Sequence, residues 1–340
     1  MPYYFALLGS AVLSAIGAPL VRAIAIKFHI LDVPNATRKA HSASVPLLGG
    51  FAIYAAIALG LAVMIYFGFL PAGYLHAREL AGIMIAGAIL VIGGALDDKI
   101  GLRPLIQFLF PLAAVVTVLA FGIHITYVKN PFGGIIDLGE WSAPLTFLWL
   151  LGLIYTTKLL DGLDGLATGV GAIGCFFIFA LALRPELNQP ETALLSLLVT
   201  GALLGFLPWN FHPARIFLGE GGSTLIGFLV GVLAIVSGSK VATTLLVIGI
   251  PAFDVLWIMW RRAIRERKSI TQGDRKHLHF RLLEVGFSHR GAVIFLWIIA
   301  AGFGGASVFL QTGMKLLLLG FLGIIMLCLV FILSRQNSSR

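Results

Sequence analysis

The stretch Ile154–Gly169, IYTTKLLDGLDGLATG, decides the class of protein. It carries two acids, Asp161 and Asp164, between apolar segments of a chain that contains few acids. In a helix, a three-residue spacing places both carboxylates on one face, and in a loop the neighbouring glycines allow a ligand to approach the backbone closely. Carboxylates at the edge of a membrane segment are costly to bury and therefore indicate a functional site. The simpler alternative is a buried ion pair with Lys158.

The composition identifies an integral membrane protein. Hydrophobic residues make up 59% of the chain and charged residues 11%, whereas a globular domain has about 25% charged residues. With roughly 20 residues per span, 340 residues allow about ten or eleven helices. We therefore expect an all-α, polytopic fold, with residues 1–340 forming a single membrane-embedded domain. The net charge of +9 fits membrane topology and a phosphate-bearing substrate, and we expect no nucleic-acid partner.

Eleven apolar runs predict the transmembrane helices. They lie near 3–26, 47–70, 79–96, 104–123, 143–158, 167–183, 191–209, 222–237, 241–260, 291–311 and 314–333. No basic residue precedes the first run, so we expect a retained span with the N-terminus outside. The C-terminus is then cytoplasmic, as are the loops near 27–46, 97–103, 158–166, 210–221 and 261–290. These segments hold most Lys and Arg residues, as the positive-inside rule requires.

The connections predicted on the non-cytoplasmic side contain few candidate site residues. The longest of them, Ile123–Ala143, contains Asn130, Pro131 and two glycines between β-branched residues. This pattern predicts a small hairpin or loop. The cytoplasmic connections hold most of the acids, and we therefore expect the site there.

The second cytoplasmic loop begins with the adjacent acids Asp97 and Asp98. Two adjacent carboxylates repel each other, and such a pair can take up a proton, hold a metal or orient a nucleophile. A solvated pair of loop acids is the alternative.

The segment 208–228 combines Asn210, Phe217 and Glu220 with a glycine-rich run that includes Gly222 and Ser223. Glycine-rich backbone before a helix start can offer N–H groups to phosphate, although this is not a Walker motif. Phe217 can stack on a base or serve as an interfacial aromatic residue.

Basic residues dominate the first and last cytoplasmic loops. The last loop contains His277, His279 and Arg281, and the first contains Arg38 and His41. A phosphate-binding loop fits the last set better than a zinc site does, because no cysteine and no third aligned histidine accompanies it. The alternatives are surface charge that only orients the protein and, for the first loop, a positive-inside anchor.

Five motifs, in this order, carry a resemblance to a known family. They are RKAHSASVPLLGG (38–50), DDKIGL (97–102), DGLDGLATG (161–169), NFHPARIFLGEGGSTLIG (210–227) and DRKHLHFRLLEVGFSHR (274–290). The chain resembles the polyprenyl-phosphate N-acetylhexosamine-1-phosphate transferases, glycosyltransferase family 4. The HLHF sequence and the loop after Asp32 look more like the N-acetylglucosamine branch than the phospho-N-acetylmuramoyl-pentapeptide transferase branch.

The resemblance implies a reaction in the bacterial plasma (inner) membrane with a cytoplasmic active site. A UDP-linked amino sugar gives its sugar-1-phosphate to undecaprenyl phosphate with help from Mg²⁺, releasing UMP and initiating a lipid-linked glycan. The resemblance also leaves room for a homodimer.

The resemblance implies roles for individual residues as well. Asp97 and Asp98 would orient or deprotonate the lipid phosphate, and Asp161 and Asp164 would hold the nucleotide sugar or help the metal. Glu220 would be the metal ligand. The remaining substrate-binding set would be Lys158, Asn210, Phe217 (against uracil), Gly222, Ser223, His277, His279, Arg281, Arg38 and His41.

The chain departs from the family pattern at the centre of this site. Family members usually have asparagine at the positions of Tyr155 and Lys158, aspartate at Glu220 and often histidine at Phe280. A protonated lysine cannot ligate a metal and repels one. We therefore expect Lys158 to pair with Glu220 or to contact the diphosphate. The alternatives to an active enzyme are a catalytically impaired homologue and a lipid-binding or transport protein on the same scaffold.

Overall fold

The computed structural model describes residues 2–33, 44–70, 76–130, 133–238, 241–260 and 277–336. Arg38 and His41, predicted to bind substrate, lie outside these described residues, as does most of the last cytoplasmic loop.

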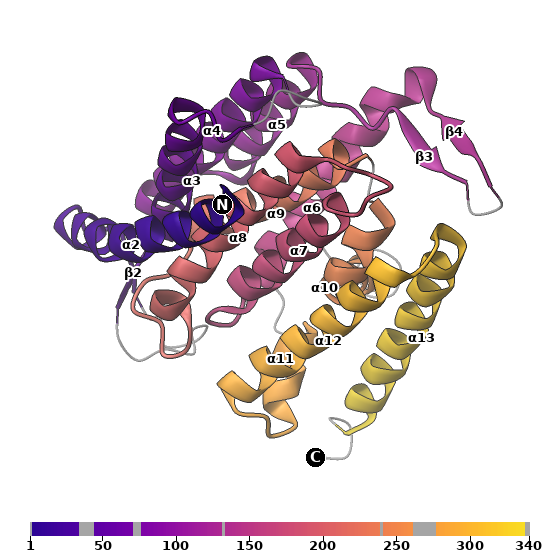
Figure 1. The fold of residues 1–340 in the computed structure, drawn as a ribbon. Coiled ribbons are helices and arrows are strands. Elements are labelled where there is room, and N and C mark those ends of the chain that lie inside the picture. The colour runs from indigo at the N-terminus through magenta and orange to yellow at the C-terminus, as the bar shows by residue number, and fades with distance from the viewer. Residues whose placement is uncertain are drawn as a thin grey trace.

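Helices dominate the described residues (Figure 1). The chain starts with α1 (Pro2–Tyr4), the π-helical turn η1 (Phe5–Gly9) and α2 (Ser10–Lys27). The helices that follow are α3 (Gly49–Tyr66), α4 (Ala77–Ile100), α5 (Pro104–Ala120), α6 (Ser142–Leu160), α7 (Leu166–Ala182), α8 (Pro190–Asn210), α9 (Gly219–Val236), α10 (Val241–Trp260), α11 (Leu278–Glu284), α12 (His289–Phe309) and α13 (Thr312–Gln336). A 3₁₀ turn, η2 (Gly139–Trp141), precedes α6.

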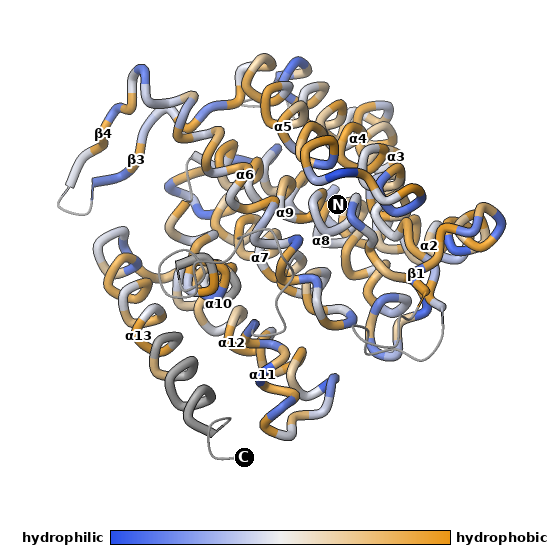
Figure 2. The backbone as a smooth tube through the Cα atoms, turned by 180° about the vertical axis from the view of Figure 1, so that it is seen from behind, coloured by the Kyte–Doolittle hydropathy of each residue, from blue (hydrophilic) through white to orange (hydrophobic). Residues whose placement is uncertain are grey.

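The lengths and hydropathy of these helices confirm an all-α, multi-pass membrane protein. Within the described residues, seven helical segments are long and apolar enough to cross a membrane, and α10, bent by 71°, makes an eighth if it counts as one span. Shorter apolar helices are α5, α7 and Thr312–Ile325 of α13. Every predicted span overlaps one of these apolar helices, while the number of true spans and their orientation stay predictions. Hydrophobic colour covers most of the helices in Figure 2, and hydrophilic colour gathers at helix ends and connections.

Two short hairpins are the only sheet among the described residues. β1 (Leu31–Asp32) pairs with β2 (Val45–Pro46). β3 (Tyr127–Lys129) pairs antiparallel with β4 (Ile135–Asp137), with Val128 opposite Ile136. The second hairpin confirms the hairpin or loop predicted for Ile123–Ala143, and it stands out from the helices in Figure 1.

Helix α9 is the centre of the packing. It is buried from Gly221 to Ile235 and contacts α3, α4, α6 and α7. Its first turn comes very close to two neighbours, because a Cβ at Gly94 of α4 would collide with the backbone of Gly221, and one at Gly50 of α3 with Gly222. These glycine contacts bring the end of α4 and the start of α3 against the start of α9, which is where the predicted acidic residues lie.

Candidate active site

Segments far apart in the sequence meet at one end of the helices. The end of α4 contacts the start of α9 through Asp98, and the end of α6 contacts it through Lys158. The turn between α6 and α7 contacts the α8–α9 connection and the start of α12 through Asp164. Because the N–H of Phe217 also bonds to the carbonyl of Pro46, the structure brings together parts of all five predicted cytoplasmic loops.

Asp98 caps the start of α9. Its carboxylate oxygens accept the backbone N–H of Glu220 at 3.1 and 3.2 Å. The first N–H groups of a helix have no partner within the helix, and a carboxylate there also interacts favourably with the helix dipole. Gly219 makes this contact possible, because its φ is +71° and a Cβ would collide with the Asp98 carboxylate.

Asp97 faces a different neighbour. One of its oxygens accepts the N–H of Leu102 at 2.8 Å and the other accepts Nε2 of Gln107 at 2.7 Å. Asp97 thus fixes the turn between α4 and α5, where Gly101 ends α4 with a φ of +62°. Its predicted catalytic role stays a prediction.

Lys158, in the last turn of α6, forms an ion pair with Glu220. The distance from Nζ to Oε1 is 2.7 Å, and the two side chains are 22% and 15% exposed. The ammonium also lies 5.6 Å from the ring centroid of Tyr155, which in turn stacks on Phe108. The pairing confirms the expected contact with Glu220, and it differs from the alternative in which Lys158 neutralises Asp161 or Asp164.

Asp161 and Asp164 lie in the turn between α6 and α7, so of the two alternatives the loop applies and the helical spacing does not. The N–H of Asp161 bonds to the carbonyl of Thr157 at 3.1 Å and closes the end of α6. Burial, together with the nearby carboxylates of Asp164, Glu220 and Asp98, raises the pKa of Asp161 from 3.8 to about 8. At neutral pH this carboxyl is therefore mostly protonated and can donate a hydrogen bond.

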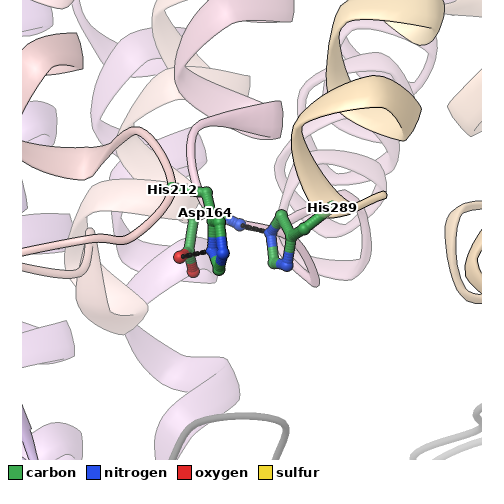
Figure 3. Close-up of side chains that lie close together, drawn as sticks. All are labelled: Asp164, His212 and His289. Atoms are coloured by element: carbon green, nitrogen blue, oxygen red, sulfur yellow. Dashed lines mark hydrogen bonds and ion pairs between the residues drawn. The ribbon is translucent and has the colours of Figure 1, made fainter. Parts of the chain in front are cut away.

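Asp164 is held by two histidines (Figure 3). Its Oδ2 accepts the N–H of Ala214 at 3.1 Å and bonds to Nδ1 of His212 at 2.8 Å. Its own backbone N–H donates to Nε2 of His289 at 2.9 Å, and the two imidazoles stack with centroids 4.0 Å apart. One ligand atom from each residue lies within 4.8 Å of the others, a spacing that suits a metal. However, the lone pair of Nε2 of His289 already accepts the Asp164 N–H and is therefore not free for a metal. The three residues form a hydrogen-bonded cluster that joins three loops.

The histidines of the last loop surround the turn from the other side. Nδ1 of His277 bonds to Oδ2 of Asp254 at 2.7 Å, and Oδ1 of Asp254 accepts the N–H of Leu278 at 3.1 Å. His279 is 3% exposed, packs against Gly162 and has no hydrogen-bond partner at Nε2 within the part of the chain that the structure describes. Burial, reinforced by His277 and His289, lowers the pKa of His279 to about 3, so its imidazole is neutral. A cavity of about 20 Å³ beside His279 and Asp254 is too small for a sugar nucleotide.

The other predicted binding residues are engaged in packing. Asn210 accepts the hydroxyl of Thr168 at 2.7 Å and donates to the carbonyl of Ile216 at 3.2 Å. The buried hydroxyl of Ser223 bonds within its own helix, and Gly222 packs on Gly50. Phe217 is half-buried, with its backbone bonded to Pro46 and Gly49, and Arg281 is buried on α11. Their roles in substrate binding stay predictions.

Three residues that hold the site together were not predicted as site residues. Asp254 is 5% exposed in the middle of an apolar run, and a lone acid in such a run is costly enough to be a usable signal. His212 and His289 lie inside the family motifs, but nothing in their spacing indicates that they meet at Asp164.

A magnesium ion does not fit at Glu220 as the structure has it. Oε1 of Glu220 is engaged by the ammonium of Lys158, which offers only donors and repels a cation. The prediction of Mg²⁺ therefore stays a prediction, and no step below is routed through it.

The site and the apolar helices define a multi-pass membrane protein with a partly buried acidic centre at one end of the helices. A family model described as glycosyl transferase family 4 matches residues 80–238. The chain is 33% identical over 301 residues to a probable undecaprenyl-phosphate N-acetylglucosaminyl 1-phosphate transferase of Bacillus subtilis, covering 86% of this chain and 81% of that protein. It is 32% identical over 343 residues to a decaprenyl-phosphate N-acetylglucosaminephosphotransferase of Mycolicibacterium smegmatis, covering 92% and 84%.

A more distant relative is the undecaprenyl-phosphate alpha-N-acetylglucosaminyl 1-phosphate transferase of Escherichia coli K12, with 28% identity over 293 residues, 82% of this chain and 76% of that protein. The chain belongs to glycosyl transferase family 4.

Proposed function

We propose that this protein transfers an N-acetylhexosamine-1-phosphate from a UDP-linked amino sugar to undecaprenyl phosphate, releasing UMP. The product is a diphosphate-linked lipid that initiates a glycan. The observation that carries the proposal is the convergence of Asp98, Asp161, Lys158 and Glu220 on the start of α9 in a chain whose relatives are named for this transfer. N-acetylglucosamine is the favoured sugar because each of the relatives named above carries it in its name.

The chemistry needs positioning more than covalent help. An oxygen of the lipid phosphate attacks the sugar-linked phosphorus, and the bond from that phosphorus to the UMP oxygen breaks. The second pKa of a phosphate monoester is about 6, so the attacking phosphate is largely deprotonated at neutral pH. The protein must therefore bring two anions together and screen their charges.

The residues of the site suit that task. Asp98 is fixed by the Glu220 N–H and would orient the lipid phosphate or take its remaining proton. Asp161, with its pKa raised to about 8 by burial, would donate a hydrogen bond to a phosphate oxygen instead of repelling it. His279, neutral because burial lowers its pKa, packs beside Gly162 and adds no charge to this turn.

The topology belongs to the same proposal. We infer eleven spans in the bacterial plasma membrane, with the N-terminus outside and both the C-terminus and the active site in the cytoplasm. The distribution of Lys and Arg and the location of Asp164, Lys158 and Glu220 at one end of the helices support this orientation. A cytoplasmic site also agrees with the cytoplasmic supply of nucleotide sugars.

The test is UMP release from UDP-N-acetylglucosamine by membranes that contain the protein and added undecaprenyl phosphate. UMP formation that depends on the lipid and is lost in Asp98→Asn supports the proposal. No UMP above the Asp98→Asn level would favour a lipid-binding or transport protein. Competition between UDP-N-acetylglucosamine and the muramoyl-pentapeptide nucleotide separates the two branches of the family.

A further inference from the structure

The ion pair between Lys158 and Glu220 is the feature of the site that the proposed reaction leaves unexplained. Its two side chains are mostly buried, whereas the other described Lys/Arg–carboxylate pair, Arg184 with Glu186, is 41% and 68% exposed. A buried pair costs desolvation and contributes little net stability, so its position needs a reason other than stability.

Several contacts hold the Lys158 ammonium in place. Glu220 engages it from α9 at 2.7 Å, and the ring of Tyr155, one turn earlier on α6, lies 5.6 Å away. Phe108 of α5 supports that ring, with centroids 6.3 Å apart. The ammonium is therefore preorganised before any ligand arrives.

The surroundings of the pair are acidic. Asp98 bonds to the backbone N–H of Glu220, and Asp161 interacts electrostatically with both Glu220 and Asp98. Even with Asp161 protonated, the carboxylates of Glu220 and Asp98 need positive charge nearby, and an anionic substrate can enter only if that charge is kept. His279, buried and without a partner at Nε2 among the described residues, packs against the same turn at Gly162.

We propose that Lys158 is the resident cation of this site: its ammonium takes the position at Glu220 that a divalent metal would otherwise take, and its remaining N–H donors bind the diphosphate of the substrate. The identity of the diphosphate rests on the proposed function, whereas the exclusion of a metal from Glu220 rests on the ion pair alone. An ammonium has three donors, so the bond to Glu220 leaves two for an anion.

Manganese binding, followed by electron paramagnetic resonance on the purified protein, tests the exclusion without any need for activity. We expect Glu220→Gln to leave the Mn²⁺ affinity and stoichiometry of the wild type unchanged. Lys158→Met frees the Glu220 carboxylate, and we expect it to tighten Mn²⁺ binding by about tenfold or more, the effect of removing one nearby repulsive charge. The double variant Lys158→Met/Glu220→Gln loses that gain.

Lys99→Met is the matched control. It removes one positive charge from the end of α4, but Lys99 is exposed and lies over the ring of Phe28 instead of contacting Glu220. We expect it to bind Mn²⁺ as the wild type does. If Lys158→Met does not fold, the comparison of the wild type with Glu220→Gln still shows whether Mn²⁺ binds at Glu220. A Mn²⁺ ion that the wild type binds and Glu220→Gln loses overturns the proposal.

UMP release in the presence of EDTA tests whether the reaction proceeds without a metal. We expect the wild type to keep its activity in EDTA and Lys158→Met to lose it there. Activity that EDTA abolishes and Mg²⁺ restores in the wild type overturns the proposal while leaving the proposed function intact. No UMP under any condition refutes the proposed function, and the Mn²⁺ comparison then stands as the test of the ion pair.

Discussion

Substitution of Gly219 by alanine tests how the start of α9 is built. The residue has a φ of +71°, and a Cβ would collide with the Asp98 carboxylate. A left-handed conformation costs an L-residue about 1 kcal/mol or slightly more, and loss of the Asp98 cap costs about 1 kcal/mol. We therefore expect a total loss of about 2–3 kcal/mol, which corresponds to a decrease in Tm of about 5 °C or more in a protein of this size.

The same substitution also displaces Asp98 from its bond to Glu220. A shift of about 1 Å in a positioning group can reduce a rate by about 100-fold, so UMP release should fall by a similar factor. The assays are thermal unfolding of the purified protein and UMP release at matched protein levels.

Gly302→Ala in α12 is the control, because a Cβ there meets no atom within 4 Å. It should leave the Tm the same or slightly higher, since alanine favours a helix over glycine. If Gly219→Ala behaved like Gly302→Ala in both assays, the contact between Asp98 and the start of α9 would not exist as described.

Three further substitutions separate structural from chemical roles. Asp98→Asn keeps an oxygen for the Glu220 N–H, so it should lower UMP release about 100-fold or more with little change in Tm, whereas Asp98→Ala should lower both. Because the folded protein raises the pKa of Asp161 to about 8, stability should fall as the pH rises from about 4 to about 8, and Asp161→Asn should flatten that slope in a series of Tm measurements. Asp254→Ala removes both acceptors that hold His277 and Leu278, so it should cost about 2–4 kcal/mol and increase hydrogen exchange in α11, whereas unchanged exchange would contradict the contact.

The positions of the helices were predictable from the sequence because each apolar run is bounded by polar residues, Pro or Gly. The predicted span 143–158 became α6, which ends at Leu160, and the hairpin at Tyr127–Asp137 followed from its β-branched and glycine pattern. The exact helix ends were less predictable. α5 ends at Ala120, before the end of its predicted span 104–123, and α7 runs one residue earlier than its predicted span 167–183.

The contacts of the site residues could be predicted only in part from the sequence. Lys158 and Glu220 were expected to pair because both depart from the family pattern, and the structure joins them at 2.7 Å. The partners of Asp164 were not visible, because His212 and His289 are 48 and 125 residues away and only the tertiary fold brings them together. Asp254 was not predicted because the site was expected in the cytoplasmic connections, whereas this acid lies buried within α10 and holds the start of α11.

The most direct test of the whole account is UMP release from radiolabelled UDP-N-acetylglucosamine, measured with the purified wild-type protein and with Asp98→Asn. The account predicts that UMP forms only when undecaprenyl phosphate is added, in equal amount to the lipid-linked sugar phosphate, and that Asp98→Asn loses this activity while remaining folded. UMP formation without lipid product, or equal rates for the two proteins, would contradict it.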